Sequence, residues 1–272
     1  MIKQSKRSIP SNKEIIGLIP AGGQGTRLGP LPCSKEIYPI GFDQSTGGRP
    51  KTVCHFLLEK MRFAGIQKAY IVLREGKWDI PSYFRDGRTL GMHLAYLIMD
   101  VPFGVPFTID QAFSFVDGAI IAFGFPDIFF EPDNTFVTLL DRLSLKQCDV
   151  VLGLFPSDRP DKTDMVDIDA EGRVKNIIIK PGQTELDLTW GVAVWTPTFT
   201  RFMHSQVKAC EPSVAAKKEL FIGDVIRKAV REGLRVDAVQ VSDKSFLDIG
   251  TPDDLRRTTK RLMLDQDSTQ IQ

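Results

Sequence analysis

Short apolar runs alternate along the chain with segments whose apolar residues recur at helical spacing. The run at 14–20 is followed by a helical pattern at 51–65 and by a second apolar run at 68–74, which predicts a βαβ unit. Five more apolar runs are expected to form strands: 93–100, 118–124, 148–155, 188–195 and 236–241. Further helices are expected at 106–116, 134–146, 197–208 and 219–232, and from Thr251 onward. This alternation predicts an α/β fold, a mostly parallel sheet with helices on both faces.

The alternation changes between residues 163 and 180. The stretch at 165–180 places Ala170, Glu171 and Gly172 between two extended runs, a pattern typical of a β-hairpin. We therefore expect the hairpin to be an addition to the sheet.

The chain has 272 residues and no internal repeat or convincing linker, so a single domain is the default expectation. That domain is expected over 14–262, between a polar N-terminal tail at 1–13 and a polar C-terminal tail at 263–272. The first of these tails lacks the apolar core of a signal peptide. Because no run approaches the roughly 20 apolar residues that span a bilayer, a soluble, cytoplasmic protein without membrane contact is expected.

The charges of the chain are balanced, with 35 Lys and Arg residues against 34 Asp and Glu residues. This balance gives no reason to expect a nucleic-acid partner, so local groups must bind any anionic ligand. The cysteines are far apart and form no Cys-x-x-Cys pair, which argues against a zinc site and a disulfide framework. They are expected to be reduced thiols: Cys33, Cys54, Cys148 and Cys210.

A glycine-rich loop follows the first expected strand. The segment IPAGGQGTRLGPLPCSKEIYPIG, at 19–41, places three glycines within four residues, ahead of Arg27 and Lys35. Ligands of open α/β sheets bind at the carboxyl ends of the strands, and glycines let backbone N–H groups approach an anion closely. The loop therefore predicts a phosphate site, in which Arg27 is a fork-shaped donor and Lys35 is a point charge.

Two familiar phosphate loops do not match this segment. A P-loop requires Ser or Thr after a Gly-Lys pair, which is absent here, and a dinucleotide fingerprint requires a third glycine or alanine where Leu28 stands. The alternative without a ligand is a glycine turn flanked by two solvated cations.

The stretch GLIPAGGQGTRLGPLPCSKEIYPIG resembles the N-terminal signature of the sugar-1-phosphate nucleotidyltransferases, the family of glucose-1-phosphate thymidylyltransferase. The family pattern is Ala-Gly-Gly-x-Gly-Thr-Arg and then Lys-x-x-x-Pro, here Lys35 to Pro39. Other segments resemble its motifs in the same order: PFGVPFTIDQAF, FGFPDIF, IIIKP, WGVAVW and FLDIGTPDDL. The resemblance implies a Rossmann-like sheet whose β-hairpin lies in the sugar-binding half.

The resemblance also implies a reaction that joins a nucleoside triphosphate to a sugar 1-phosphate and releases pyrophosphate, with Mg²⁺ as cofactor. The attacking phosphate oxygen is already anionic at neutral pH, because the second pKa of a phosphate monoester is about 6, so no protein base is needed. The histidines lie outside these motifs and are expected to serve packing or the surface: His55, His93 and His204.

Matching the motifs position by position assigns roles to single residues. Arg27 and Lys35 are expected to be catalytic, binding the triphosphate and its departing end, and Asp127 and Asp248 are expected to hold Mg²⁺. Taken singly, each aspartate would also suit a turn or a helix cap. The residues expected at the sugar phosphate are Lys180, Gly191 and Asp164. The residues expected around the nucleotide are Ala21, Gly22, Gly23, Gly25, Thr26, Met99 and Gly104.

Several positions depart from the family pattern. Ile179 stands where many relatives have a sugar-binding glutamate, Asp164 where a glycine often lines the sugar, and Trp190 where asparagine or threonine precedes a glycine. Met99 takes the approximate place of a base-reading glutamine, and Pro126 interrupts the Gly-Asp metal motif. The nucleotide base and the phosphorylated acceptor are therefore left open.

Two other functions fit parts of the sequence. A nucleotide-sugar-binding regulatory pseudoenzyme would share the fold, but it would not need all the cations and carboxylates named above. A glycosyltransferase of related fold would require an Asp-x-Asp metal motif, and the letters Asp-Ile-Asp at 167–169 lie in the expected hairpin. The sequence leaves open whether the chain forms a homo-oligomer.

Overall fold

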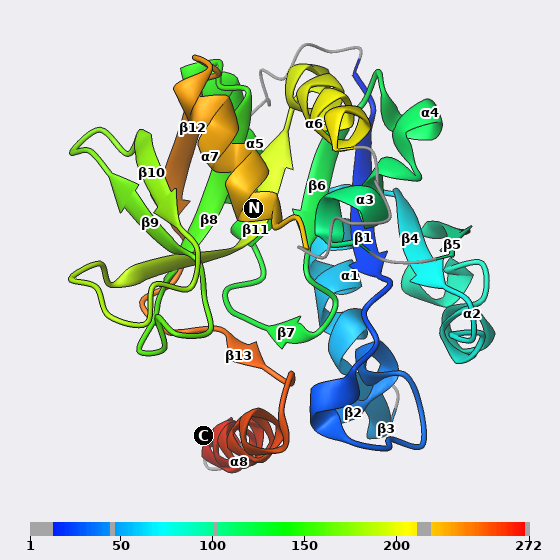
Figure 1. Ribbon diagram of the computed structural model, residues 1–272. Coiled ribbons are helices and arrows are strands. Elements are labelled where there is room, and N and C mark those ends of the chain that lie inside the picture. Colours follow the sequence, from blue (N-terminus) through cyan, green and yellow to red (C-terminus); the bar gives the residue numbers. More distant parts are fainter. Residues whose placement is uncertain (1–12, 44–46, 101–102, 211–218, 270–272) are drawn as a thin grey trace, which may run out of the picture.

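The molecule is built on one mixed β-sheet with helices on both faces (Figure 1). In the computed structural model, which describes residues 13–43, 47–100, 103–210 and 219–269, this sheet has nine strands. The central strands are apolar runs buried on both faces, as strands between two helix layers must be. The expected α/β sheet of mostly parallel strands is therefore confirmed.

Four strands form a parallel part of the sheet: β1 (Ile15–Ala21), β4 (Lys68–Arg74), β5 (His93–Met99) and β6 (Ile120–Gly124). They lie in the order β5-β4-β1-β6, with Leu18 of β1 between Tyr70 of β4 and Phe123 of β6. All four end within one residue of the expected position, so their carboxyl ends lie where the sequence places them.

The remaining strands of the sheet are β8 (Val150–Pro156), β9 (Met165–Ile168), β10 (Val174–Ile178), β11 (Leu188–Trp195) and β12 (Val236–Gln240). β11 runs antiparallel to β6, β8 and β9, and β8 runs parallel to β12. β9 and β10 pair antiparallel, which confirms the expected hairpin. Its turn contains Gly172 at φ +86°.

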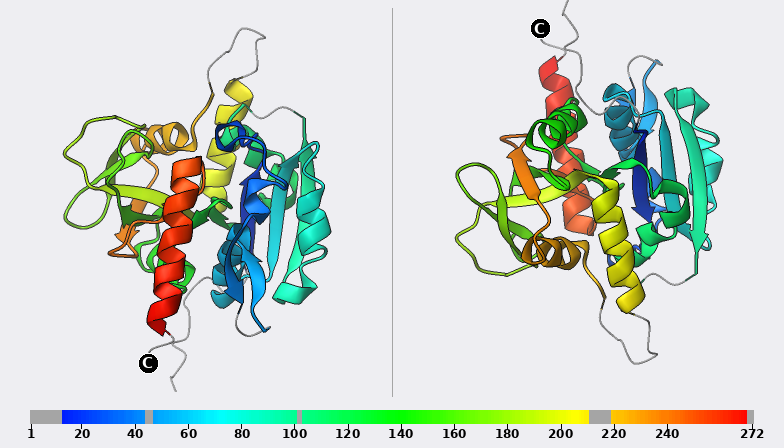
Figure 2. Two further views of the ribbon diagram at one scale, coloured as in Figure 1. Left: turned by 90° about the horizontal axis from the view of Figure 1, so that it is seen from below. Right: turned by 90° about the horizontal axis from the view of Figure 1, so that it is seen from above.

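Seven helices of the described chain cover the sheet (Figure 2). One face carries α1 (Val53–Phe63), α2 (Asp79–Phe84) and α5 (Thr135–Lys146). The other face carries α3 (Val105–Asp110), α4 (Phe113–Val116), α6 (Pro197–Ala209) and α7 (Ile222–Arg231). Each face has its own cluster of buried apolar side chains, so the strands are held between two cores.

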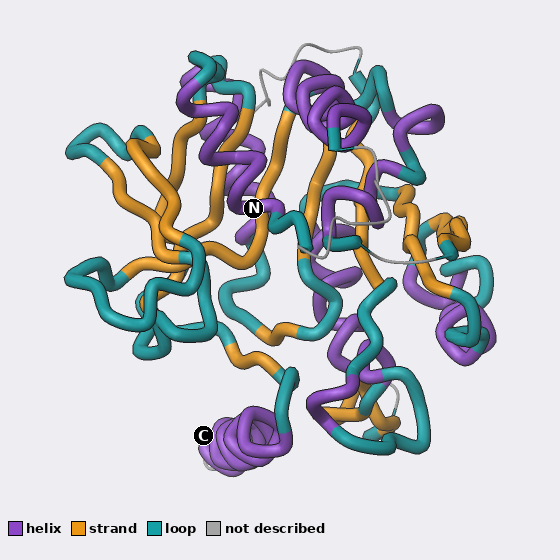
Figure 3. The backbone as a smooth tube through the Cα atoms, in the orientation of Figure 1, coloured by secondary structure: helices purple, strands orange, loops and turns teal. Residues whose placement is uncertain are grey.

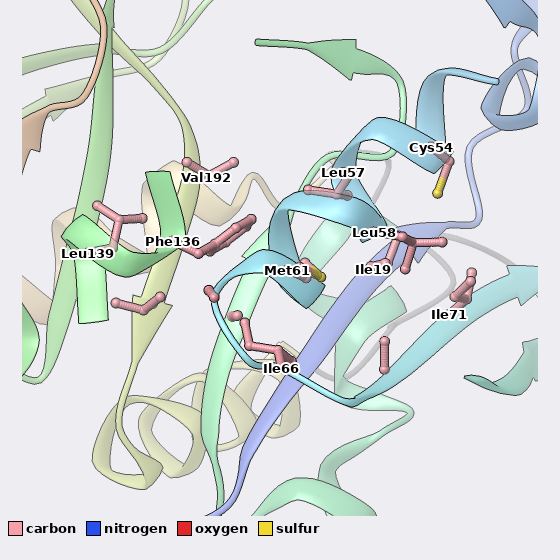
Figure 4. Packing of buried hydrophobic residues seen from close by; sticks show 14 of the residues in the cluster. Ile19, Cys54, Leu57, Leu58, Met61, Ile66, Ile71, Phe136, Leu139 and Val192 are labelled. Carbon is pink, nitrogen blue, oxygen red and sulfur yellow. The ribbon is translucent and has the colours of Figure 1, made fainter. Parts of the chain in front are cut away.

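Helix α1 packs against the sheet through apolar residues that recur at helical spacing (Figure 4). Its Leu57, Leu58 and Met61 recur at helical spacing, and they share one core cluster with Ile19 of β1 and Ile71 of β4. All five side chains are fully buried. Burying such a side chain contributes about 1.5–3 kcal/mol relative to leaving it exposed. This packing fixes the end of β1, from which the glycine loop leaves.

Two short strands and the long C-terminal helix lie below the sheet in Figure 1. β2 (Pro39–Asp43) and β3 (Arg49–Thr52) form an antiparallel pair, and α8 (Pro252–Thr269) lies in contact with β2. The β2–β3 pair was not expected, and it places residues 51 and 52 in a strand ahead of α1.

Other boundaries also differ from the sequence expectation. The helix expected at 106–116 is broken into α3 and α4, because the segment consists largely of β-branched and aromatic residues with few strong helix formers. The helix expected at 219–232 begins only at Ile222. Helix α8 continues to Thr269, beyond residue 262, where the domain was expected to end. The tail expected at 1–13 lies almost wholly outside the described residues.

Among the described residues, no helix has the length and apolar character that a membrane span requires.

Candidate active site

The glycine loop begins where β1 ends, at the carboxyl edge of the parallel strands. Gly22 packs against Met99: a Cβ at Gly22 would lie 3.1 Å from the Met99 Sδ and 3.3 Å from the Thr108 Cγ2. Gly25 has φ +68°, in the left-handed region that favours glycine. Arg27 is exposed on the short 3-10 helix η1 (Thr26–Leu28) that follows. The structure thus places Met99, expected on the base side, directly against the loop.

Lys35 opens a second 3-10 helix, η2 (Lys35–Ile37), and forms an ion pair with Asp127. Burial alone would lower the pKa of Lys35, but Asp127 and Glu36 raise it above its ordinary value. Burial alone would likewise raise the pKa of Asp127, but Lys35 holds it below its ordinary value. Lys35 and Asp127 are therefore a charged pair at neutral pH.

Two short strands near the metal candidates form a small antiparallel sheet, which is seen as two short strand segments side by side in Figure 3. β7 (Ile128–Phe129) directly follows Asp127, and it pairs with β13 (Leu247–Asp248). The Ile249 N–H also donates to the Asp127 carbonyl oxygen at 3.2 Å. Burial, and after it the charge of Asp127, raises the pKa of Asp248 to about 6. Two carboxylates from distant parts of the chain thus lie within electrostatic reach of each other.

Helix α8 anchors the strand that carries Asp248. The Thr258 Oγ1 donates to the Asp248 carbonyl oxygen at 3.1 Å. Asp254, near the start of α8, is buried and pairs with Arg159 and Lys162 from the loop after β8. β13 is therefore held by its partner strand and by a helix whose buried Asp254 forms two partly buried ion pairs.

Asp127 and Asp248 suit a magnesium site that is completed by substrate. Mg²⁺ in phosphoryl-transfer sites is commonly held by one or two carboxylates, with substrate phosphates and water as the other ligands. In the described part of the chain, no group of three or more His, Cys, Asp or Glu side chains could hold a metal ion. The two carboxylates therefore fit an ion whose remaining ligands are phosphates and water. They do not fit a site in which the protein supplies all the ligands.

Two of the residues expected on the acceptor side, Lys180 and Asp164, lie near the end of β10. Lys180 has a left-handed backbone at φ +41°, and its ammonium lies 4.6 Å from the centroid of the Phe221 ring. Gly223 leaves room for its neighbours, since a Cβ there would lie 2.5 Å from the Asp164 Oδ2 and 2.6 Å from the Ile179 Cδ1. The two unusual residues of this side, Asp164 and Ile179, therefore both pack against the start of α7.

Asp164 is a carboxylate in an unfavourable environment. Its Oδ1 is buried and has no hydrogen-bond partner within the described residues. Burial raises the pKa of Asp164 to about 6, against the charges of Lys180 and Arg227, which lower it. An acceptor left unsatisfied in this way costs folding free energy, and a donor group on a bound ligand would relieve that cost.

We expect Asp164→Asn to raise the free energy of unfolding at pH 8 by about 1–3 kcal/mol. Because the folded-state pKa lies above the ordinary 3.8, the native carboxyl stabilises the fold at low pH, and this contribution is lost as the pH rises through about 6. The variant has no carboxyl group to ionise at this position, so its free energy of unfolding should exceed that of the native protein only slightly at pH 4. Urea unfolding at both pH values measures the effect, with Asp167→Asn in β9 as the control. An equal shift at both pH values would contradict this assignment.

Two glycines expected at the site are required by close packing. A Cβ at Gly191 would lie 2.9 Å from the Ile128 Cδ1, so β11 and β7 are in contact there. Gly104 has φ +113°, and a Cβ there would lie 2.1 Å from the Leu220 carbonyl oxygen. The Leu220 N–H donates to the Phe103 carbonyl oxygen at 3.1 Å. The loop on the nucleotide side is therefore joined to the segment that leads into α7.

The expected residues form two groups in the structure. In the first group, the charge of Arg27 reaches Asp248, and a Cβ at Gly23 would lie 4.0 Å from the Lys35 Cε. The second group contains Lys180 and Asp164, and Gly191 connects the groups through its contact with β7. The other two residues expected around the nucleotide stand at the end of β1 and in η1: Ala21, which is buried, and Thr26, which is exposed.

Sequence patterns did not reveal four polar residues around Lys35, which are Ser34, Glu36, Lys77 and Asp79. The one sequence feature that could have indicated a buried charge is Glu36, which begins the otherwise apolar and aromatic stretch EIYPI. Its burial depends on a partner that lies 41 residues away along the chain, which no local pattern indicates.

The Asp-Ile-Asp letters at 167–169 serve the hairpin. Asp167 pairs with Lys175 of the neighbouring strand at 2.9 Å. The Asp169 carboxylate accepts the backbone N–H groups of Glu171 and Arg173 in the turn. Both aspartates thus have structural partners, which disfavours the glycosyltransferase alternative.

Comparison with known proteins identifies the family. The family model for nucleotidyl transferases matches residues 16–263, so the chain belongs to the nucleotidyl transferase family. It is 24% identical over 260 residues to the low-salt glycan biosynthesis nucleotidyltransferase Agl11 of Haloferax volcanii, and the match covers 92% of this chain and 66% of that protein. It is 25% identical over 250 residues to a glucose-1-phosphate thymidylyltransferase of Neisseria meningitidis, with 88% and 79% covered. The chain thus spans just under two thirds of the archaeal relative.

Solved structures show the same fold. A Bacillus anthracis protein provisionally classed as a glucose-1-phosphate thymidylyltransferase matches with a TM-score of 0.77 at 20% identity, over 91% of this chain and 95% of that one. A UDP-glucose pyrophosphorylase in complex with UDP-glucose matches with a TM-score of 0.74 at 17% identity, over 93% and 99%. At these identities the likeness establishes the fold alone.

Proposed function

We propose that this chain is a sugar-1-phosphate nucleotidyltransferase, which joins a nucleoside triphosphate to a sugar 1-phosphate and releases pyrophosphate. The observation that carries the proposal is the meeting of the glycine loop, Lys35, Asp127 and Asp248 beside the carboxyl ends of β1 and β6. Family membership over 16–263 supports it, as do relatives named for this type of reaction.

The proposed reaction requires charge stabilisation and no proton transfer from the acceptor. The acceptor phosphate carries an anionic oxygen at neutral pH, because its second pKa is about 6. Two histidines have carboxylate partners in other parts of the fold, His55 with Glu59 and His204 with Asp110. His93 stands at the start of β5. Among the described residues, no hydrogen bond or ion pair joins a histidine to Lys35, Asp127 or Asp248. On this chemistry no histidine base is needed.

The cations of the chain have separate tasks in this proposal. Arg27 and Lys35 bind the triphosphate and stabilise the negative charge that develops on the departing pyrophosphate. Lys180 binds the acceptor phosphate and reduces its repulsion from the triphosphate. Asp127 and Asp248 would hold Mg²⁺, which when bound supplies additional positive charge beside the phosphates. Lys35 is kept in place by its ion pair with Asp127.

A matrix of substrates tests this function. The common ribonucleoside triphosphates and dTTP are each combined with a panel of sugar 1-phosphates, and pyrophosphate release is measured with and without the acceptor. Acceptor-dependent pyrophosphate release is the expected result. Binding of nucleotide sugars without turnover for any pair would instead support a regulatory pseudoenzyme.

We expect Asp164→Gly to weaken use of the preferred sugar phosphate by about 10-fold or more, since buried polar recognition has this reach. Ile179 replaces a charged acceptor of the family pattern, and Asp164, with its buried and unpartnered Oδ1, would supply another from a different position. The apparent affinity for the triphosphate should change little. Steady-state kinetics with each substrate varied in turn measures both quantities, and an equal loss for the two substrates would indicate a structural role.

A further inference from the structure

Both chain neighbours of Lys35 are tied to one short segment that follows β4. On one side, the Ser34 backbone N–H and hydroxyl donate to the two Asp79 carboxylate oxygens at 2.6 and 2.7 Å. On the other side, the Lys77 ammonium donates to Glu36 at 2.6 Å. Lys77 and Asp79 are two residues apart, so one turn of the chain holds both flanks of Lys35.

The Glu36–Lys77 pair is deeply buried. The side chains are 1% and 7% exposed, and the second Glu36 oxygen has no partner within the described residues. Burial raises the pKa of Glu36 and lowers the pKa of Lys77, while their mutual attraction opposes both shifts. A buried ion pair is weak support for stability, because removing two charges from water costs about as much as their attraction returns. Glu36 directly follows Lys35 in the chain, and the charges of the pair act on Lys35, so a role of the pair in positioning Lys35 is an alternative to a role in stability.

The η2 turn makes this arrangement rigid. The Ile37 N–H donates to the Ser34 carbonyl oxygen, and the Tyr38 N–H donates to the Lys35 carbonyl oxygen, both at 3.0 Å. A lysine side chain has many rotamers, so a fixed backbone is needed if its ammonium is to occupy one position. The backbone of Lys35 is fixed by this turn and by anchored residues on both sides.

We infer that Lys77 and Asp79 are positioning residues that hold Lys35 in place for catalysis. The inference rests on the proposed function, because it gives Lys35 its role at the triphosphate. Asp79 acts through Ser34, and Lys77 acts through Glu36. Within the described residues, neither forms a hydrogen bond or ion pair with the two aspartates of the site, and the charge of Lys77 adds to that of Lys35 in lowering the pKa of Asp127. The segment at 76–79, which carries no motif of the family resemblance, thus becomes part of the catalytic arrangement.

The test combines Asp79→Ala with Lys35→Ala. Asp79 is only half-buried, so the single variant should fold. It should lower kcat about 10-fold or more, the range seen when a supporting contact of an active-site group is lost, with little change in the KM for the triphosphate. In the Lys35→Ala background the same substitution should change kcat less than about 2-fold, because residues that act through one group are not additive. The control is Asp86→Ala, because the Asp86 carboxylate is exposed and accepts the Arg88 backbone N–H.

A second pair of variants tests the buried half. Lys77→Met leaves the Glu36 carboxylate buried without its partner, so its folding is checked by circular dichroism. The combination Glu36→Gln/Lys77→Met removes both charges and takes its place if the single variant does not fold. Either should lower kcat about 10-fold while leaving the triphosphate KM nearly unchanged, again only when Lys35 is present.

Two results would overturn the inference. One is near-native kcat in Asp79→Ala. The other is a kcat loss that multiplies with that of Lys35→Ala, as a general structural defect would. Failure of the proposed function would be recognised from the native protein alone, which would then release no pyrophosphate with any substrate pair.

Discussion

Replacing Lys35 with alanine is expected to lower turnover about 100-fold or more while the fold remains intact, which is the effect of losing one electrostatic donor at a developing charge. Lys35 is a largely buried cation that is paired with one of the two carboxylates of the site, Asp127, and this pairing keeps it charged. The ammonium would stabilise charge on the departing pyrophosphate, which is greatest in the transition state. Turnover should therefore fall more than the affinity for the triphosphate does.

The matched control for this experiment is Lys175→Ala. Lys175 also forms an ion pair with an aspartate, but it is exposed and lies on the hairpin. Its removal should leave turnover within about 2-fold of native, as most exposed substitutions do. Circular dichroism and thermal unfolding confirm that both variants fold. A Lys35→Ala enzyme within a few-fold of native turnover would remove Lys35 from the mechanism.

Asp127→Asn and Asp248→Asn are each expected to cause a large loss of turnover, and the double variant should be little worse than the poorer single variant. Asp127 directly precedes β7, and Asp248 lies on its partner strand β13. The two carboxylates influence each other electrostatically, so they would serve one ion. Groups that act as a unit give non-additive losses. Activity should also disappear with a chelator and return with Mg²⁺ or Mn²⁺.

Steady-state kinetics of the four enzymes in the presence of saturating Mg²⁺ measures this coupling. Asp254→Asn is not a suitable control, because that carboxylate anchors α8 through two ion pairs. Asp253→Asn on the exposed first turn of the same helix is suitable. Losses that multiply in the double variant would indicate two independent sites, and near-native Mg²⁺-dependent turnover in either single variant would exclude that residue as a ligand.

The sheet could be predicted from the sequence because its central strands are continuous apolar runs. The bounds of β4 and β11 match the expected 68–74 and 188–195 residue for residue. The short strands could not be predicted in this way. β7 and β13 have two residues each, too few to show any period, and only their pairing makes them strands.

In the candidate site, only the residues that belong to a sequence motif could be predicted. Lys35, Asp127 and Asp248 were assigned from residue type and motif order, and the structure places them together. The contacts of Glu36 and Ser34 join the connection that follows β1 to the connection that follows β4, so they arise from tertiary packing. The expectation of one helix at 106–116 was also wrong, because the segment has few strong helix formers and forms two shorter helices, α3 and α4.

The most direct test of the central proposal follows the α-phosphorus. A nucleoside triphosphate that gives turnover in the substrate matrix is labelled at the α-phosphate and incubated with its sugar 1-phosphate and Mg²⁺. We expect the label in a nucleoside diphosphate sugar and unlabelled pyrophosphate in equal amount, only when both substrates are present. Label remaining in the triphosphate, or released in a nucleoside monophosphate or diphosphate without the sugar, would contradict nucleotidyl transfer to a sugar phosphate.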